Sequence, residues 1–145
     1  MARTMFIKNN FLKKKVKDLI LDLSKTPVVK EKTILKETLE KMVLFKIGMA
    51  CVVNKNNLLL GVITDGDLRR KLLENQKPWG ALLNDDTIIH CRKNPITINY
   101  NDNLKKALNL IIKKRVWDLP VLDNRKHLIG IIHLQNILNL VMKND

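Results

Sequence analysis

The hydrophobic pattern of the chain repeats itself. A shift of 69 residues places Gly61 on Gly130, Val52 on Val121 and Ile63 on Ile132. Few residues are identical, yet the apolar positions match without a gap over about 40 residues. Two unrelated βαβ units would not be expected to keep a constant offset over so long a stretch, so the pattern indicates an internal duplication.

Each copy has the order β-α-β-β-α. A short strand follows a proline, and a helix with apolar residues at i, i+3/4 and i+7/8 comes next. Two apolar runs are then separated by an Asn- or Asp-rich turn, which indicates a hairpin, and an amphipathic helix closes the copy. The first copy places these elements at residues 27–29, 35–43, 49–53, 58–63 and 65–73, and the second at 95–98, 104–112, 119–122, 128–132 and 134–142. The turns fall at 54–57 and 123–126.

A unit of roughly 55 to 60 residues buries too little surface to be stable alone. We therefore expect an α+β fold in which the two copies pack sheet against sheet as a pseudo-two-fold pair around one shared core. The pattern divides the chain into an N-terminal segment (1–14), a first repeat (15–73), a linker (74–88) and a second repeat (89–145). Trp79 is expected to pack over the joint formed by the linker.

Composition limits the classes of function. Apolar residues make up 46% of the chain and aromatic residues 4%, so the core is built mainly from Ile, Leu and Val. The 27 Lys and Arg residues against 14 Asp and Glu give a net charge of +13. The lysines are scattered among many asparagines, which favours a small anionic ligand over nucleic acid as the partner of this positive field.

Cysteine and histidine usage points to neither a disulfide framework nor a metal site. Cys51 lies in an apolar run and is expected to be a small buried hydrophobe. His90 adjoins Cys91, but adjacent side chains on a strand would point to opposite faces. We expect no metal ligands. No signal peptide is apparent and no apolar run is long enough to span a bilayer, so we expect a soluble cytoplasmic protein.

The stretch GVITDGDLRR (61–70) is the first candidate site. Thr64 ends a strand, and Asp67 lies one turn into the next helix. Free N–H groups at a helix N-terminus favour a phosphate, Gly66 allows close approach of the backbone, and Arg69 adds charge. An alternative needs no ligand: Thr64 as N-cap and Asp67 at N3 form a capping box. The two interpretations are compatible with each other.

The second copy departs from this pattern. His133 stands in place of Thr64 and Asn136 in place of Asp67. A protonated histidine can donate to a phosphate, whereas Asn cannot accept two ribose hydroxyls as a carboxylate does. Trp117 could stack on a base, or it could pack at a dimer interface or over a helix. Asp118 beside it is expected to be solvated, and the two corners are therefore expected to differ.

Residues 15–142 contain two β-α-β-β-α repeats, and each repeat ends a strand in Gly-apolar-x-Thr-x-x-Asp or its equivalent. This combination resembles a tandem pair of CBS domains. The resemblance implies a nucleotide in the cleft between the repeats, with Thr64 on phosphate and Asp67 on ribose hydroxyls. It extends the candidate ligand-binding set to Thr64, Gly66, Asp67, Arg69, Val28, Pro120, His133 and Asn136. It also implies a homodimer, and a module that biases an attached domain and is no enzyme by itself.

A more specific resemblance is carried by residues 61–70, by LIGIIHLQNIL (128–138) and by KVKDLI (15–20). These look like the C-terminal CBS pair of bacterial arabinose-5-phosphate isomerases. That family implies a catalytic sugar-isomerase (SIS) domain in cis, which serves synthesis of the lipopolysaccharide or capsule sugar Kdo. Only 14 residues precede the first repeat, so the chain is expected to be a fragment or a free-standing relative.

Two other interpretations remain open from the sequence. CBS pairs of some sugar-nucleotide transferases carry a similar Thr-Asp-Gly-Asp segment, and a CBS pair can serve as a structural or oligomerisation module without a ligand. If a ligand is bound, the resemblance implies an adenine nucleotide, a cytidine nucleotide or a CMP-sugar, and it implies no required cofactor.

Overall fold

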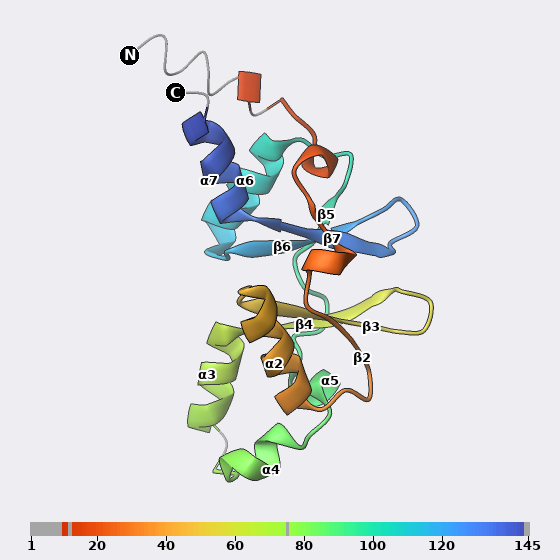
Figure 1. The fold of residues 1–145 in the computed structure, drawn as a ribbon, viewed down its shortest axis with the longest axis vertical. Coiled ribbons are helices and arrows are strands. Elements are labelled where there is room, and N and C mark those ends of the chain that lie inside the picture. The colour runs from red at the N-terminus through yellow and green to blue at the C-terminus, as the bar shows by residue number, and fades with distance from the viewer. Residues whose placement is uncertain (1–9, 12, 75, 144–145) are drawn as a thin grey trace.

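The computed structural model describes residues 10–11, 13–74 and 76–143 and consists of two stacked sheets with helices on their outer sides (Figure 1). One sheet has the strand order β2-β3-β4, and the other has the order β1-β7-β6-β5. The strands are β1 (Leu21–Asp22), β2 (Val28–Lys30), β3 (Met49–Val53), β4 (Leu59–Thr64), β5 (Ile98–Asn99), β6 (Asp118–Leu122) and β7 (Leu128–His133).

The two sheets have the same internal pairing. In the first, β2 runs parallel to β3 and β3 antiparallel to β4; in the second, β5 runs parallel to β6 and β6 antiparallel to β7. Helices α2 (Leu35–Phe45) and α3 (Asp65–Glu74) cover the first sheet, and α6 (Leu104–Lys114) and α7 (Leu134–Lys143) cover the second (Figure 1). The predicted α+β fold of two stacked repeats is confirmed.

The predicted turns form as tight hairpins with matching chemistry. The Asn54 side chain accepts backbone hydrogen bonds from Asn56 and Leu58, and Asp123 does the same for Arg125 and His127. The turns close through Asn57 and Lys126, whose φ angles are 63° and 68°. Side chains that hydrogen-bond to the backbone two residues ahead are what Asn and Asp contribute to turns.

The segment that precedes each repeat, which we call its lead-in, packs against the other repeat. The first lead-in, with the short 3₁₀ helices η1 (Val16–Asp18) and η2 (Leu23–Lys25), places β1 antiparallel to β7 in the sheet of the second repeat. Its Phe11 and Val16 are buried in the core of that repeat. The second lead-in, with α4 (Trp79–Leu83) and α5 (Thr87–His90), buries Leu82 in the core of the first repeat.

Equivalent backbone hydrogen bonds fix both lead-ins. The Leu104 N–H donates to the Lys14 carbonyl at 2.8 Å, and the Leu35 N–H donates to the Asp85 carbonyl at 2.9 Å. The sequence predicts residues 74–88 as a linker, but residues 79–83 are helical, and Trp79 on α4 is 69% exposed and does not pack over the joint. His90, predicted on a strand, ends helix α5, and its Nε2 lies 2.9 Å from Asp85.

A third group of buried side chains lies between the sheets and holds the repeats together. It combines strand residues of the first sheet with Leu128 and Ile131 of β7. Cys51 is fully buried within it, as predicted. The tips of the two hairpins are also joined, because the Leu128 N–H donates to the Asn57 carbonyl and the Asn57 side chain donates to the Leu128 carbonyl.

None of the helices in the described ranges has the length and apolar character needed to cross a bilayer. In the same part of the chain, no group of three or more His, Cys, Asp and Glu side chains could hold a metal ion.

Candidate functional site

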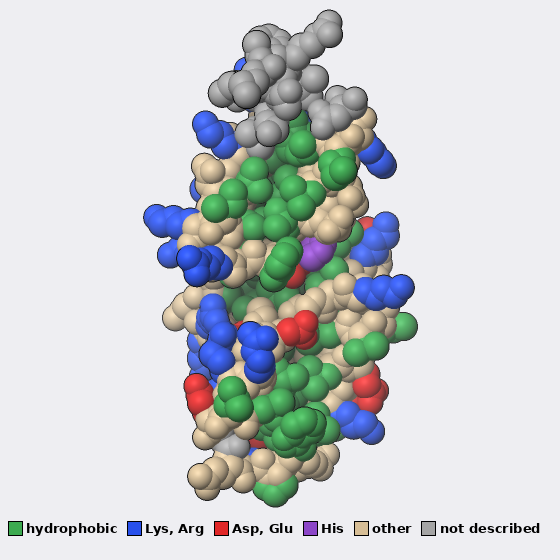
Figure 2. Space-filling model, turned by 90° about the vertical axis from the view of Figure 1, so that its left-hand side faces the viewer, with side chains coloured by type: hydrophobic (Ala, Val, Ile, Leu, Met, Phe, Trp, Pro, Cys, Tyr) green, Lys and Arg blue, Asp and Glu red, His purple; other side chains and the backbone are tan. Residues whose placement is uncertain are grey.

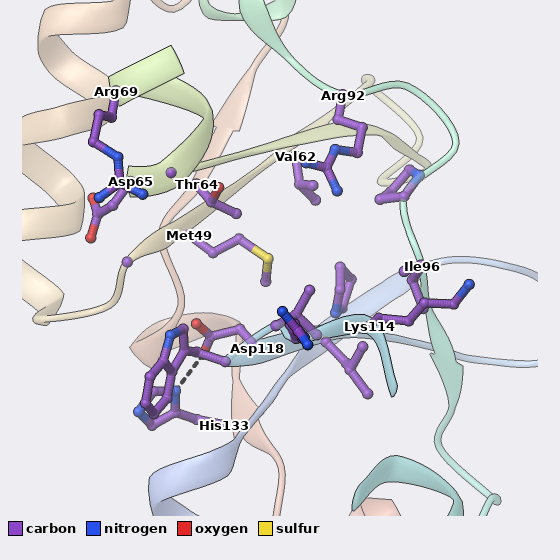
Figure 3. Close-up of a pocket in the computed structure, with 18 of the residues that line it drawn as sticks. Met49, Val62, Thr64, Asp65, Arg69, Arg92, Ile96, Lys114, Asp118 and His133 are labelled. Carbon is purple, nitrogen blue, oxygen red and sulfur yellow. Dashed lines mark hydrogen bonds and ion pairs between the residues drawn. The ribbon is translucent and has the colours of Figure 1, made fainter. Parts of the chain in front are cut away.

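A cleft of about 580 Å³ opens between the two repeats. Its walls come from the starts of β3, α3 and β6, from the end of α6 and from the segment around residues 92–96. In Figure 3, Thr64, Asp65 and Arg69 lie on the side of the first repeat, opposite Asp118 and His133 on the side of the second. The sheets are held at this distance by the apolar core between them, so the cleft is part of the fold.

The first corner of the cleft is a capping box. The Thr64 Oγ1 accepts a hydrogen bond from the Asp67 N–H at 3.1 Å, and the Asp67 carboxylate accepts one from the Thr64 N–H at 3.1 Å. This reciprocal pair satisfies two backbone donors at the start of α3. The capping alternative predicted from the sequence is confirmed, and Thr64 itself still lines the cleft.

Asp67 is engaged on its other side as well. Its Oδ1 accepts hydrogen bonds from Arg70 and from Arg92, the latter at 2.8 Å, and the residue is only 8% exposed. Burial would raise the pKa of Asp67, but the hydrogen bonds from Arg70 and Thr64 and the charge of Arg92 outweigh it and lower that pKa. The Asp67 side chain faces a separate hollow of about 290 Å³, which His90 and Cys91 also line.

The two corners share one backbone plan but carry different side chains. The Asp65 N–H donates to the Gly48 carbonyl at 3.1 Å, and the Leu134 N–H donates to the Trp117 carbonyl at 2.9 Å. A Cβ on Gly48 would lie 2.7 Å from a carboxylate oxygen of Asp65, so a side chain there would require the Asp65 carboxylate to move. The second corner carries Trp117 at the equivalent position, where it lines the cleft and is 68% exposed.

The second corner is a histidine held by a buried carboxylate. Asp118 and His133 face each other across β6 and β7, in the register that Met49 and Thr64 occupy in the first repeat. The His133 Nδ1 is hydrogen-bonded to the Asp118 carboxylate (Figure 3). The Asp118 side chain is 5% exposed, so the expectation of a solvated Asp118 is wrong. The hydrogen bond to Asp118 raises the pKa of His133, against the opposing effect of burial.

The cleft is strongly cationic. Arg69, Arg70, Arg92, Lys114 and Arg115 line it, against the carboxylates of Asp65 and Asp118. Arg70 and Arg92 are paired with Asp67. Within the described part of the chain, Arg69, Lys114 and Arg115 form no ion pair with a carboxylate. Figure 2 shows Lys and Arg side chains gathered at mid-height, where the repeats meet. Such a field attracts an anionic ligand.

The structure brings five of the eight sequence-derived candidates together. Thr64, Gly66, Arg69, Pro120 and His133 all line the cleft. The described lining does not include Val28, Asp67 or Asn136. Val28 pairs with Cys51 in the first sheet and packs against the core between the sheets, and Asn136 is half-buried in the first turn of α7.

The cationic residues Arg92, Lys114 and Arg115 were not predicted as site residues. Lys114 ends α6, and Arg115 caps that helix in the left-handed conformation with φ 54°. Arg92 belongs to the second lead-in, where its backbone pairs with Val62 of β4. The hydrophobic pattern locates the end of α6 to within two residues, but only the crossing of the lead-in brings Arg92 to this cleft.

Two stacked β-α-β-β-α repeats with a cleft between them indicate that the chain consists of two copies of one domain. The CBS domain family matches residues 16–74 and 86–143 of the chain. The chain therefore belongs to the CBS domain family and contains two copies of that domain.

Similar curated proteins are considerably longer than this chain. An uncharacterized protein of Helicobacter pylori (strain J99) is 33% identical over 130 residues, which make up 89% of this chain and 38% of that protein. A probable arabinose 5-phosphate isomerase of Haemophilus influenzae is 31% identical over 91 residues, which make up 63% of this chain and 26% of that protein.

Solved structures share the fold. The crystal structure of CBSX2 in complex with AMP has a TM-score of 0.77 and 27% identity, covering 89% of this chain and 96% of that one. The CBS domain pair of protein MJ0100, in complex with 5'-methylthioadenosine and S-adenosyl-L-methionine, has a TM-score of 0.76 at 18% identity and covers 91% of this chain and 98% of that one. At 18% identity, the similarity to the MJ0100 structure is evidence for the fold only.

Proposed function

We propose that this chain is a regulatory CBS pair that binds an anionic nucleotide or nucleotide-sugar in the cleft between its repeats. The observation that carries the proposal is the composition of the cleft. Three cations that form no ion pair among the described residues, a helix start and an exposed Trp117 converge on one hollow. Cationic side chains and helix N-termini bind phosphate groups, and an indole offers a face on which a base can stack.

The ligand contacts in this proposal come from both repeats. Thr64, Gly66 and Arg69 approach from the start of α3, and Pro120 and His133 approach from β6 and β7. Asp67 supports the first corner from behind, because the capping box and the two arginines already use its carboxylate. AMP bound to CBSX2, the relative at 27% identity, supports a nucleotide as the class of ligand.

The parent protein in this proposal is a sugar-phosphate isomerase of the arabinose-5-phosphate isomerase type, with a catalytic SIS domain in cis. The relative from Haemophilus influenzae, which is 31% identical over 63% of this chain, supports this assignment. Ligand binding in the cleft would change the packing of the repeats and so bias the catalytic domain.

Calorimetric titration tests the ligand proposal. AMP, ATP, CMP and a CMP-sugar are each titrated into the full chain, and we expect a saturable signal from at least one of them. Arg69→Gln and Trp117→Ala should each weaken that binding by about tenfold, because a charge-assisted hydrogen bond or a stacking face is lost. Lys55→Gln in the β3–β4 turn is the matched control and should bind normally. Absence of heat from all four ligands contradicts the proposal.

A second role, as an oligomerisation module, is favoured by exposed apolar side chains on the helices. Val43 and Ile112 occupy equivalent positions in the two repeats and are 78% and 65% exposed, and Leu73 and Met142 are equivalent and 83% and 73% exposed. Figure 2 shows apolar side chains on this helix-covered face above and below the hollow. We propose that a second copy of the chain covers them, because a face with its own two-fold repetition suits a two-fold partner.

A further inference from the structure

We propose that Asp118 and His133 make the second corner of the cleft a pH-dependent phosphate site, in which the His133 imidazolium binds a phosphoryl group and Asp118 is its positioning residue. The inference deepens the proposed function and rests on an anion entering the cleft. It assigns the phosphate end of the ligand to the second repeat and makes affinity rise as the pH falls.

The hydrogen bond to Asp118 decides which histidine nitrogen can meet a ligand. An ionised carboxylate only accepts hydrogen bonds, so the Nδ1 bonded to Asp118 carries a proton. The Nε2 is then the nitrogen available to the ligand. In the neutral ring Nε2 has a lone pair and cannot donate to a phosphate oxygen, whereas in the imidazolium it is an N–H donor. Phosphate binding at this corner therefore requires protonated His133.

Exposure separates the roles of the two side chains. Both residues line the cleft, but the His133 side chain is 23% exposed and the Asp118 side chain only 5%, so the ring is the more accessible of the two. Asp118 supports the positive charge on the ring, and its hydrogen bond to His133 offsets its own negative charge. The first repeat has Met49 and Thr64 at the same two positions, and neither of these can titrate in this range.

The charged groups around His133 favour an anion at this corner. Those lining the same cleft come from α3, from the second lead-in and from the end of α6: Asp65, Arg69, Arg70, Arg92, Lys114 and Arg115. Histidine is the side-chain type that normally changes its charge between pH 5 and 8, so His133 is the group through which pH acts on this cleft. The raised pKa of His133 agrees with this arrangement.

Nitrogen NMR of the histidine rings in the full chain tests the inference, with inorganic pyrophosphate as the probe. We expect the titration midpoint of His133 to move upward when pyrophosphate is added, because the anion binds only the imidazolium. His127 supplies an internal control, because it lies in the β6–β7 turn and is not among the described cleft residues, so its ring signals should not respond to pyrophosphate. An unmoved His133 midpoint in saturating pyrophosphate overturns the inference.

Two variants separate positioning from direct contact. Asp118→Asn should lower the His133 midpoint and reduce its response to pyrophosphate. The titration of pyrophosphate itself is common to both proteins, so the affinity of the parent chain relative to that of His133→Gln isolates the histidine. This ratio should fall by about tenfold between pH 6 and pH 8. If Asp118→Asn does not fold, as judged from its amide spectrum, His133→Gln decides alone, and retention of the full pH dependence contradicts the inference.

The outcomes distinguish this inference from the proposed function. Nucleotide binding with an unmoved His133 midpoint leaves the sensing function intact and overturns the phosphate corner. A moved midpoint with pyrophosphate, together with no heat from any nucleotide, supports the corner and removes the nucleotide as its ligand.

Discussion

Gly130 lies directly against the carbonyl of Leu21. A Cβ placed on Gly130 would come within 2.0 Å of that oxygen, and the residue has a φ of 155°. The contact exists because β1 pairs with β7 at this point, with Asp22 opposite Gly130. Gly130→Ala should lower the free energy of unfolding by about 3 kcal/mol, because the added methyl group must displace the lead-in strand. Urea denaturation measures this change.

Gly80 on α4 provides the matched control for this substitution. A Cβ there meets nothing within 4 Å, so Gly80→Ala should change the free energy of unfolding by no more than about 0.5 kcal/mol. Equal effects of the two substitutions would contradict the close approach of β1 to β7.

The capping box at the start of α3 makes a separate contribution to stability. Thr64→Ala removes the hydroxyl that accepts from the Asp67 N–H, and we expect a loss of about 1 kcal/mol in the free energy of unfolding. Thr64→Ser keeps the hydroxyl and should retain most of the stability. If the Ser and Ala variants are equally unstable in urea, the hydroxyl is not the stabilising group.

The Asp118–His133 pair links stability to pH. The pKa of His133 is raised in the folded chain, so its contribution to stability is fully present below the unfolded value of about 6.5 and disappears as the pH rises through the folded pKa. The parent chain should therefore lose stability relative to His133→Gln between pH 6 and pH 9. If the difference in free energy of unfolding between the two proteins is the same at pH 6 and pH 9, the linkage is contradicted.

The exposed apolar side chains on α2 and α6 predict an effect on oligomeric state. Val43→Glu and Ile112→Glu each place a carboxylate within the proposed two-fold interface, and their combination should convert a dimer into a monomer. Light scattering after size exclusion measures the mass. Lys55→Gln, which lies in the β3–β4 turn and changes the net charge by the same amount as either single substitution, should remain dimeric. A monomeric parent chain would refute the interface outright.

Local patterns made the elements of this fold predictable, because each strand, turn and helix has its own periodicity and end signals. The helix predicted at 35–43 extends over Leu35–Phe45, and the one predicted at 134–142 over Leu134–Lys143. The crossing of the lead-ins was not predicted. Its signal is a second offset: Phe11 and Leu82 are 71 residues apart and both buried, whereas the repeats themselves match at 69. Because the lead-ins match at a different offset, comparing the sequence with itself at the offset of the repeats alone does not reveal that they correspond.

The candidate site was predictable where its residues are close in sequence. Thr64 and Asp67 lie three residues apart, and capping chemistry depends on that spacing. Asp118 and His133 are separated by 15 residues and meet only through the register of the β6–β7 hairpin. Asp118 directly follows the exposed Trp117, and nothing in its immediate neighbours indicates a buried ion partner.

The pairing of β1 with β7 also places the first lead-in beside the strand that carries His133. β7 ends at His133 in the cleft, and its central residues Gly130 and Ile131 pair with Asp22 and Leu21 of β1. We expect a displacement of β7 to reach β1 through these backbone contacts, without an intermediary from the first repeat. A strand that carries a cleft histidine and a strand of the segment preceding the first repeat are thus neighbours in a single sheet.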